Sequence, residues 1–481
     1  MKISQVFSEY TKDVDVESIM DDSRKKENNA IFFCIDGKYN DGHNYVDMAI
    51  NNGAICIVHS KELNNYRDDI SYVKVDDTMY WFNEFTASFF DNVSEKMKVF
   101  AVTGTSGKTT SAWILADIIS HFEKSSYIGS IGYLLDNQLI DDTGLTTPRT
   151  LQMHETLSKI YKSGCKVACI EASSEGIEAH RVDSVKFESL IFTNLAADHI
   201  DFHGSMENYF MAKAKIFMRM PKDKVVAINK DDEYGRRLID MTPCRVVTFG
   251  FSNDADYQAK NVKEFSDHCE FTLVYKNKEY FVKTNLIASF NVYNLLGDIA
   301  LCNENGYPLE EIIPYLNNIK KVPGRCVIID EGQDFNVVLD LAFNGNAFEK
   351  IFKYAKSITP EGNKIICVFG QAGNRDQNRR IDSAKIADKY CDCIVLTTDN
   401  PAYEDPDEIA KEVESYLVKI KPTYIKDREK AIEYGLSLTN KGDTICVLGK
   451  GDEAFMIYEN KRLPYAGDEY YLRKYLKELK K

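Results

Sequence analysis

Short apolar runs alternate with stretches of helical periodicity along most of this chain, and most of the runs end in glycine, asparagine, aspartate or threonine. Buried parallel strands have this pattern, because helices cover both faces of their sheet and functional side chains follow their carboxyl ends. We therefore predict buried strands in the runs AICIV (54–58), KVFAVTG (98–104), VACIEA (167–172), SLIFTNL (189–195), KVVAINK (224–230), KIICVFG (364–370), CIVLTTDN (393–400) and TICVLGKG (444–451).

One of these strands runs into AVTGTSGKTTSAW, residues 101–113. Glycine lets backbone N–H groups approach phosphate oxygens, and the start of a helix favours an anion. The segment predicts a shortened phosphate loop in which Lys108 reaches the β- and γ-phosphates and a following threonine holds Mg²⁺. The alternative is a chance strand–glycine–helix turn. The residues assigned to the nucleotide are Gly104, Thr105, Gly107, Lys108, Thr109 and Thr110.

Turn-forming stretches divide the chain into three blocks, since DNVSEKM ends the first and Pro323-Gly324 opens the third. Apolar residues at i, i+3, i+4 and i+7 after Lys108 predict a helix with one buried face. The charged end YYLRKYLKELKK (470–481) predicts a solvated terminal helix. We predict an α/β protein with a central P-loop-type, mostly parallel sheet and a Rossmann-like third domain, in domains 1–97, 98–322 and 323–481.

The net charge of −14 disfavours non-specific nucleic-acid binding, which needs a basic surface. The sequence contains neither a signal-peptide core nor 18 uninterrupted apolar residues, so we expect no membrane insertion. The twelve cysteines are scattered, and Cys56, Cys367 and Cys446 fall inside strand-like runs. We read them as buried thiols of a reduced, cytoplasmic protein, which we expect to be a monomer.

Two strand ends carry candidate metal ligands: Glu171 follows the first, and Asn194, Asp198 and His199 follow the second. A carboxylate and an imidazole behind a phosphate loop suit a divalent cation, although each alone is more often a cap or a satisfied polar group. Helix YFMAKAKIF adds Lys213 and Lys215, for which a solvated face is the alternative. Further polar positions at strand ends or a helix start, none diagnostic alone, are Asn291, Asn294, Gly370, Gly373, Arg375 and Asp376, with the loops TTDNPAYEDP and LGKGDEAF.

The motifs and their order resemble the Mur ligases, ATP-dependent amide-forming enzymes of peptidoglycan synthesis, over nearly the whole chain. The likeness is greatest to the branch that adds the third amino acid to UDP-N-acetylmuramoyl-L-alanyl-D-glutamate. TGTSGKTT resembles the family's ATP loop, and AKAKIF (212–217) its A-K-x-x-L-F element. The resemblance implies a carbamylated Lys213, with Thr109, Glu171 and His199 as the other magnesium ligands.

The resemblance also implies substrate contacts. Asp22-Ser23-Arg24 and IDGKYNDGHNYVDMAINNGA (35–54) match the family's uridine-nucleotide segment, and GQAGNRD and DNPA match third-domain signatures. The implied nucleotide contacts are Asn291, Asn294 and Arg325. The implied substrate contacts are Ser23, Asp41, Gly42, His43, Thr146, Thr147, Ser173, Ser174, Arg181, Arg375, Asp399, Asn400, Glu404, Gly449 and Glu453.

The chain departs from the family mostly in its nucleotide and third-domain motifs. D-Y-A-H-x-P-D reads Asp340-Leu-Ala-Phe343-Asn-Gly-Asn346, and G-K-G-H-E carries Asp452. S-S-H ends in Glu175, and the glutamate usually found after G-R-x is Val327. Because of these changes, the chain has two interpretations, a housekeeping enzyme and a divergent paralogue.

The implied mechanism transfers the γ-phosphoryl group of ATP to a substrate carboxylate, and an amine then attacks the acyl phosphate. Lys108, Lys213, His199 and Glu171 are the implied catalytic residues. The partners are UDP-N-acetylmuramoyl-dipeptide and a free amino acid, and closure of the third domain would exclude water.

We predict L-lysine as that amino acid. Family members that take meso-diaminopimelate carry D-N-P-R, whose arginine pairs with the distal carboxylate. Here the arginine position is Ala402, and Glu404 and Glu453 could meet a distal ammonium group. Solvated loop acids, or a pocket reshaped for ornithine, are the alternatives.

Two other functions stay open. One is a related ligase with another carboxylate substrate, such as a folate-polyglutamate ligase, against which the uridine-nucleotide segment argues. The other is a nucleotide-binding pseudo-enzyme, which the lost D-Y-A-H motif favours and the retained Lys108, Glu171, His199 and Lys213 oppose.

Overall fold

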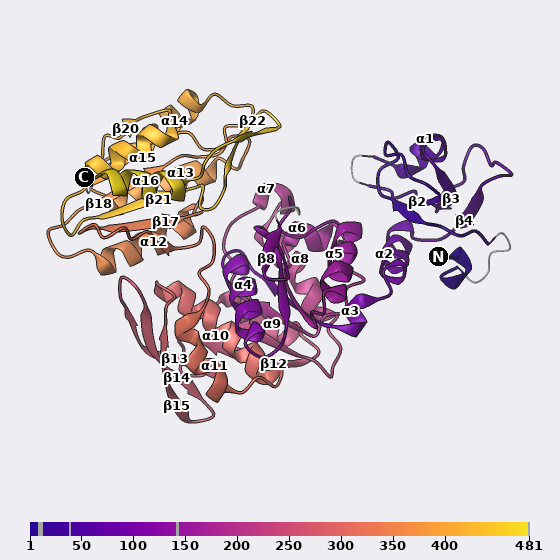
Figure 1. Ribbon diagram of the computed structural model, residues 1–481, viewed down its shortest axis with the longest axis horizontal. Coiled ribbons are helices and arrows are strands. Elements are labelled where there is room, and N and C mark those ends of the chain that lie inside the picture. Colours follow the sequence, from indigo (N-terminus) through magenta and orange to yellow (C-terminus); the bar gives the residue numbers. More distant parts are fainter. Residues whose placement is uncertain (8–12, 38–39, 141–143, 480–481) are drawn as a thin grey trace. The chain divides into compact units, whose positions relative to one another are not determined.

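The computed structural model describes residues 1–7, 13–37, 40–140 and 144–479 (Figure 1). Part of the uridine-nucleotide segment, residues 38–39, and the last two residues of the expected terminal helix lie outside these ranges. The described chain forms two compact units, Met1–Thr103 with Glu123–Leu190, and Gly104–Phe122 with Ile191–Lys481. The division into three domains stays a prediction.

The first unit begins with a four-stranded parallel sheet in the order β1-β2-β3-β4. Successive residues of β2 point to opposite faces, so that Phe33 packs with Phe85 and Phe32 packs with Ala49. The elements are η1 (Ile3–Gln5), β1 (Ser18–Met20), β2 (Ala30–Phe33), η2 (Gly42–Tyr45), α1 (Val46–Asn51), β3 (Ala54–His59), β4 (Ser71–Lys74), α2 (Thr78–Phe89) and α3 (Val93–Lys96).

The rest of this unit holds the strand run β5-β9-β6-β7-β8, parallel as far as β6 and antiparallel beyond it. Polar residues that follow β9 therefore lie at the carboxyl ends of the parallel strands, where α/β proteins bind their ligands. The elements are β5 (Lys98–Thr103), β6 (Ser125–Gly129), β7 (Gly132–Leu135), β8 (Gln138–Ile140), α5 (Thr150–Lys162), β9 (Val167–Glu171) and α6 (Ser174–Glu178), and β10 (Ser189–Phe192) spans the boundary of the two units.

The second unit starts with α4 (Lys108–Ser120), which is buried on every side from Thr109 to Ile119. The predicted single buried face is therefore wrong, because α10 and other elements cover the polar positions too. Strands β11, β12 and β13 are parallel, and β14 and β15 extend them in antiparallel fashion. The elements are α7 (Ile200–His203), α8 (Met206–Met218), β11 (Val225–Asn229), α9 (Glu233–Met241), β12 (Arg245–Gly250), β13 (Tyr257–Glu264), β14 (Cys269–Tyr275), β15 (Lys278–Thr284), α10 (Ser289–Glu304), α11 (Leu309–Tyr315) and η3 (Leu316–Asn318).

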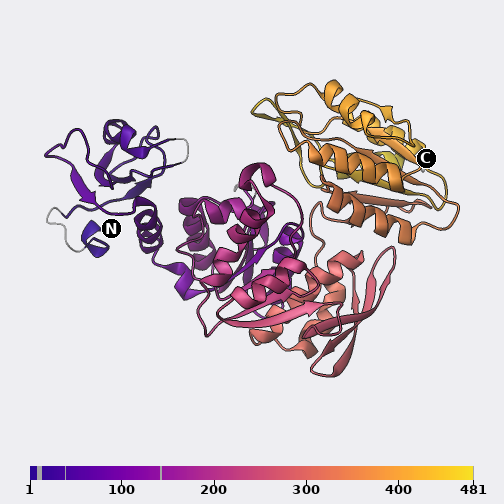
Figure 2. The same cartoon turned by 180° about the vertical axis from the view of Figure 1, so that it is seen from behind.

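The C-terminal part of the second unit is a doubly wound sheet in the order β16-β17-β21-β18-β19-β20. Alternate strand residues enter two cores: α12, α13 and α14 cover one face, and α15 and α16 cover the other (Figures 1 and 2). The elements are β16 (Val327–Ile328), β17 (Asn336–Asp340), α12 (Gly345–Ile358), β18 (Ile365–Phe369), α13 (Asn378–Tyr390), β19 (Cys393–Leu396), α14 (Pro406–Ser415), β20 (Thr423–Tyr424), α15 (Arg428–Ser437), β21 (Thr444–Leu448), β22 (Phe455–Tyr458), β23 (Lys461–Pro464) and α16 (Asp468–Leu479).

The structure confirms the α/β class and all the predicted strands, with ends shifted by at most a few residues. All twelve cysteines are free thiols, and every one except Cys393 is buried. The terminal helix exists, but it is not simply solvated: Leu472, Tyr475 and Leu476 pack into the core beneath the sheet. None of the helices in the described ranges combines the length and the apolar character needed to cross a bilayer.

Candidate active site

The loop between β5 and α4 needs glycine at two positions. Gly104 has φ +151°, and a Cβ there would lie 2.0 Å from Thr193 Oγ1. Gly107 has φ +91°, and a Cβ there would lie 2.3 Å from Asn294 Oδ1. Asn194 holds the same loop, because its backbone oxygen accepts from Thr105 N at 2.8 Å and its side chain accepts from Ser106 N at 3.1 Å. Neighbouring strands and α10 therefore fix the loop.

Two lysine side chains converge on one carbonyl oxygen of this loop. Lys108 Nζ donates to Gly104 O at 3.0 Å and to Thr105 O at 2.9 Å. Lys213 Nζ donates to the same Gly104 O at 2.9 Å. The structure thus brings the two predicted catalytic lysines together at the phosphate loop, from elements a hundred residues apart in the chain.

Lys213 and Lys215 differ sharply in their surroundings on α8. Lys213 is 1% exposed, and its Nζ lies 4.6 Å from the centroid of the Tyr209 ring. Lys215 is exposed. The solvated-face alternative is therefore wrong for Lys213 and right for Lys215.

Asp198 is held by groups from far along the chain. It is 7% exposed, and its carboxylate lies 2.8 Å from Arg379 Nη2 and 3.3 Å from Asn344 Nδ2. Burial raises the pKa of Asp198, but the charges of Arg379, His199 and Lys108 and the Arg379 hydrogen bond together outweigh it, so the pKa is lowered. Arg379 also lies over the Phe343 ring at 4.8 Å. Phe343, at the family's histidine position, thus packs on the arginine that pairs with Asp198, and the neighbouring Asn344 donates to the same carboxylate.

Glu171, at the end of β9, is 1% exposed in the first unit. Its Oε1 accepts hydrogen bonds from Tyr127 Oη and, at 2.9 Å, from Ser130 N. Ser130 Oγ lies 3.2 Å from Glu171 Oε2 and 3.1 Å from Thr146 Oγ1. Tyr127 and Ser130, which the sequence did not single out, therefore orient this predicted metal ligand.

The predicted peptide-binding residues of the first unit form one network. Thr147 Oγ1 donates to Glu171 O at 2.8 Å and accepts from Ser173 N at 2.9 Å. Arg181 Nη1 donates to Thr147 O at 2.9 Å, and burial lowers the pKa of Arg181. A pocket of about 230 Å³ beside them brings Arg181 and Arg149 together with apolar side chains. Asp21 also lines this pocket, so its two guanidinium groups exceed its one carboxylate, and the net positive charge suits an anionic ligand.

The uridine-nucleotide segment folds around His43. Nδ1 of His43 lies 2.5 Å from Asp41 Oδ1, and Nε2 accepts from Ser60 N at 3.1 Å, which assigns the proton to Nδ1. Lys61 Nζ donates to Asp41 Oδ2 at 2.7 Å. Burial raises the pKa of Asp41, but hydrogen bonds from Lys61 and His43 outweigh it and hold the pKa well below its usual range. A Cβ at Gly42 would lie 2.7 Å from a backbone nitrogen, so only glycine fits.

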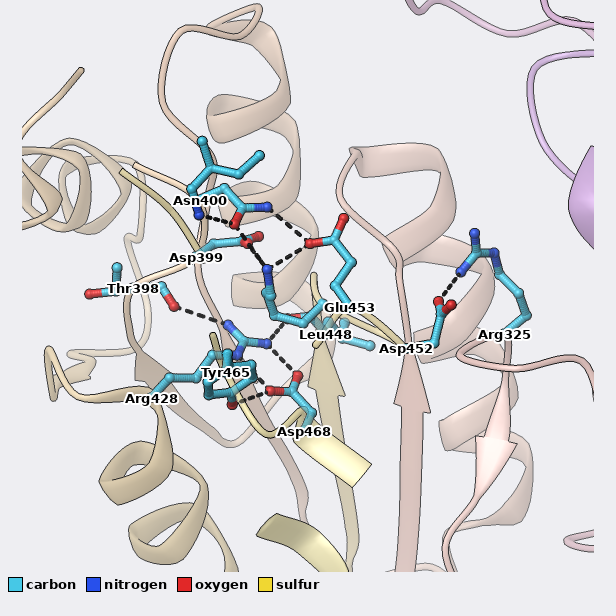
Figure 3. A network of polar contacts seen from close by, with 12 residues as sticks. Arg325, Thr398, Asp399, Asn400, Arg428, Leu448, Asp452, Glu453, Tyr465 and Asp468 are labelled. Carbon is cyan, nitrogen blue, oxygen red and sulfur yellow. Dashed lines mark hydrogen bonds and ion pairs between the residues drawn. The ribbon is translucent and has the colours of Figure 1, made fainter. Parts of the chain in front are cut away.

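The loops after β19 and β21 meet at Lys450, which is fully buried (Figure 3). Lys450 Nζ lies 2.9 Å from Asn400 Oδ1, 2.6 Å from Glu453 Oε2 and 3.7 Å from Asp399 Oδ1. Burial raises the pKa of Asp399 to about 6, and Asp399 Oδ1 has no hydrogen-bond partner among the described residues. A Cβ at Gly449 would lie 2.9 Å from Asp399 Oδ2.

A second buried ion pair supports the same loops. Arg428 binds Asp468 through two hydrogen bonds of 2.8 and 2.7 Å and donates to Leu448 O at 2.9 Å (Figure 3). Tyr465 Oη donates to Asp468 Oδ1 at 2.7 Å. Because both ions are buried and fully paired, the pair stabilises the backbone just before Gly449.

Glu404 is already paired in this structure. It accepts from Arg380 Nη2 at 2.8 Å and from Asn374 N, so it ties the loop after β18 to the loop after β19. Arg375 in the first of these loops is exposed. Asp452, at a position of divergence, lies 3.2 Å from Arg325 Nη1.

The described units place the predicted residues as follows. The first unit holds Ser23, Asp41, Gly42, His43, Thr146, Thr147, Glu171, Ser173, Ser174 and Arg181. The second unit holds Gly104, Thr105, Gly107, Lys108, Thr109, Thr110, His199, Lys213, Asn291, Asn294, Arg325, Arg375, Asp399, Asn400, Glu404, Gly449 and Glu453. Their roles as ligand contacts stay predictions.

Fold and loop define a nucleotide-binding α/β enzyme. Family models agree: the Mur ligase middle domain matches residues 102–302, and the Mur ligase glutamate ligase domain matches residues 324–451.

Relatives match almost the whole chain. UDP-N-acetylmuramoyl-L-alanyl-D-glutamate–2,6-diaminopimelate ligase of Fusobacterium nucleatum is 35% identical, over 95% of this chain and 93% of its own. Ligase 1 of that name from Clostridium acetobutylicum is 34% identical, over 97% and 96%. A solved structure of a ligase with the same name is 26% identical with a TM-score of 0.70, over 97% and 96%. The chain belongs to the Mur ligase family and is an ATP-dependent ligase.

Proposed function

We propose that this ligase joins UDP-N-acetylmuramoyl-L-alanyl-D-glutamate to a diamino acid in peptidoglycan synthesis. The observation that carries the proposal is the convergence of Lys108 and Lys213 on Gly104 O, because it puts the cation of Lys108 and the amine that would form the carbamate, on Lys213, beside the loop where ATP phosphates would bind. The names of the relatives supply the substrate class. A cytoplasmic location and a monomeric state stay predictions.

The reaction has two steps. A carboxylate oxygen of the substrate attacks the γ-phosphorus of ATP. ADP leaves, and the substrate carboxylate becomes an acyl phosphate. The amine then attacks the acyl carbon, loses a proton and expels phosphate, which leaves an amide. The chain contributes position and charge: backbone N–H groups and Lys108 neutralise the phosphates, and Arg181 neutralises the anionic substrate.

We propose Mg²⁺ and a lysine carbamate from the chemistry of the donors that the resemblance names. His199 and a hydroxyl group of α4, in the second unit, and the carboxylate of Glu171, in the first unit, are donor types that such an ion accepts. Within the described ranges, no three histidine, cysteine or acidic side chains are already grouped as for a metal ion. The buried Lys213 amine, once deprotonated, can add CO₂ and lose a proton to become an anionic oxygen donor. Mg²⁺, when bound there, would supply positive charge to the reacting phosphate and carboxylate.

We propose L-lysine as the amine substrate. Ala402 offers no cation to a distal carboxylate, and a buried unpaired charge is costly. Glu453 is 28% exposed and can accept from a distal ammonium group. The second candidate is 2,6-diaminopimelate, which the names of the relatives favour.

The test is phosphate release from ATP with UDP-N-acetylmuramoyl-L-alanyl-D-glutamate and a panel of lysine, ornithine and meso-diaminopimelate. Amide product with one of the three supports the proposed reaction, and the preferred amine identifies the substrate. ATP-dependent product with none of them would contradict the proposal and favour another carboxylate or a pseudo-enzyme.

A further inference from the structure

Lys450 is a buried cation that the sequence did not single out. Its side chain is fully buried beneath the loops that follow β19 and β21. An ammonium group has three donors and no acceptor, so a buried lysine is stable only where acceptors surround it. Here the neutral amide of Asn400 and the carboxylate of Glu453 accept from two of these donors, and Asp399 adds a second carboxylate at 3.7 Å. Figure 3 shows how Asp399, Asn400 and Glu453 lie around this point.

Lys450 determines which way the Asn400 amide faces. Asn400 Oδ1 accepts from Lys450 Nζ at 2.9 Å and from Ile457 N at 2.9 Å. With its oxygen turned toward these two donors, Asn400 must turn its Nδ2 outward, where it donates to Glu453 Oε2 at 3.0 Å. The amide orientation follows from this network of donors and acceptors.

With Lys450 bound to Oε2 of Glu453, the other carboxylate oxygen, Oε1, is available to a ligand. Oε2 of Glu453 takes both the Lys450 and the Asn400 hydrogen bonds. Oε1 accepts no hydrogen bond from any described residue, and the side chain is 28% exposed. In Figure 3 the dashed lines at Glu453 reach only one of its two carboxylate oxygens. A carboxylate anchored by one oxygen presents the other in a fixed direction.

The charges of the cluster favour a cationic ligand. Asp399 and Glu453 are two acids, and Lys450 neutralises one of them. Arg428 contributes little, because Asp468 pairs with it through two hydrogen bonds. With Asp399 ionised the cluster carries one excess negative charge, which attracts an ammonium group and repels a carboxylate.

We propose that Lys450 is a positioning residue of the amino-acid pocket, where its ammonium group orients Asn400 and Glu453 toward the distal cationic group of the incoming amino acid. This inference rests on the proposed function. Lys450 acts through Glu453 and Asn400 and does not itself touch the substrate.

The experiment compares Lys450→Met with Lys426→Met, which changes an exposed lysine in the loop after β20 that pairs with Asp407. Initial rates are measured with the amine that the wild-type enzyme uses best. We expect Lys450→Met to raise the KM for that amine about tenfold, as loss of a hydrogen bond to a charged group does. The kcat and the KM for ATP should stay within about twofold, and Lys426→Met should resemble the wild type.

A double-mutant cycle separates positioning from general stability. On a Glu453→Gln background, Lys450→Met should raise the KM by less than about threefold, because the group it orients is gone. An unchanged KM in the single variant, or the same increase on both backgrounds, overturns the proposal.

Folding and substrate failures give different results. If Lys450→Met does not fold by circular dichroism, Lys450→Gln takes its place, and failure of both to fold overturns the proposal by making Lys450 a core residue. A wild-type enzyme that ligates no amine of the panel contradicts the proposed function itself. Normal wild-type ligation with no KM shift contradicts only the role of Lys450.

Discussion

The phosphate loop and the amino-acid pocket have similar positions in the fold, but backbone atoms form the first and side chains form the second. Each follows the carboxyl end of parallel strands. The buried Lys213 of α8 contacts the phosphate loop, and the buried Lys450 lies in the pocket itself. Lys213 donates to a backbone oxygen, Gly104 O, whereas Lys450 donates to the side chains of Asn400 and Glu453. A site built on backbone atoms needs a few glycines and one lysine, whereas a site built on side chains depends on every residue in the network.

This difference explains where the chain departs from its family. The family histidine at 452 is an aspartate here, and it pairs with Arg325 at 3.2 Å. The D-Y-A-H segment ends in Phe343 and Asn344, which contact Arg379 and Asp198. Side-chain networks accept such replacements when the partners change together. A backbone loop has no such freedom, because a Cβ at Gly107 would collide with Asn294.

The largest effect should come from the backbone-built loop. Lys108→Ala should lower kcat about a thousandfold, because removal of a preorganised charge at the transferred phosphoryl group is not compensated. The thermal melting curve should stay close to that of the wild type, since the hydrogen bonds from Lys108 to Gly104 O and Thr105 O are local to the loop. Ligation at a near-wild-type rate would rule out this role for the loop.

The next-largest effect tests Lys213, the buried lysine of α8 that donates to the phosphate loop. Lys213→Ala should lower activity about a hundredfold or more, since it removes a charge at the site, and Lys215→Ala is the matched control on the same helix. Removal of bicarbonate and CO₂ should slow the wild type, and intact-mass measurement should detect added CO₂. If Lys215→Ala is the damaging change, the assignment is off by half a helical turn.

A smaller effect is expected in the side-chain-built pocket. Glu453→Gln should raise the KM for lysine about tenfold by removing a charged acceptor. Ala402→Arg should improve the use of meso-diaminopimelate about tenfold relative to lysine, since arginine binds a carboxylate through two hydrogen bonds. Competition among lysine, ornithine and meso-diaminopimelate measures both. A wild-type preference for meso-diaminopimelate would contradict the assignment of lysine as the substrate but not the ligase function.

The last effect concerns stability rather than activity, and it depends on pH through Asp399. Burial raises its pKa in the folded state to about 6, above the value of 3.8 expected for an exposed aspartate. The folded state therefore binds the proton more tightly, and stability relative to Asp399→Asn should rise as the pH falls from 7 toward 4, by at most about 3 kcal/mol. Melting temperatures of both proteins across this range measure it. A difference that is constant with pH would show that Asp399 does not titrate there.

The sequence by itself determined the strands, the phosphate loop and the family. Apolar runs and glycine spacing are local properties, so the ends of β5, β9 and β11 could be predicted closely. The resemblance likewise named Glu171, His199 and Lys213 before any contact was known. Local patterns are sufficient where the backbone itself makes the site.

Only the tertiary structure decided which side chains share a network. Lys450 meets Asn400 across fifty residues, and Arg379 meets Asp198 across 181 residues. The sequence also left open that α4 is buried all round and that α16 packs under a sheet, because a helix's periodicity does not show what covers its other faces. Burial is the physical reason: it turns Lys213 and Lys450 from solvated lysines into groups held by particular acceptors.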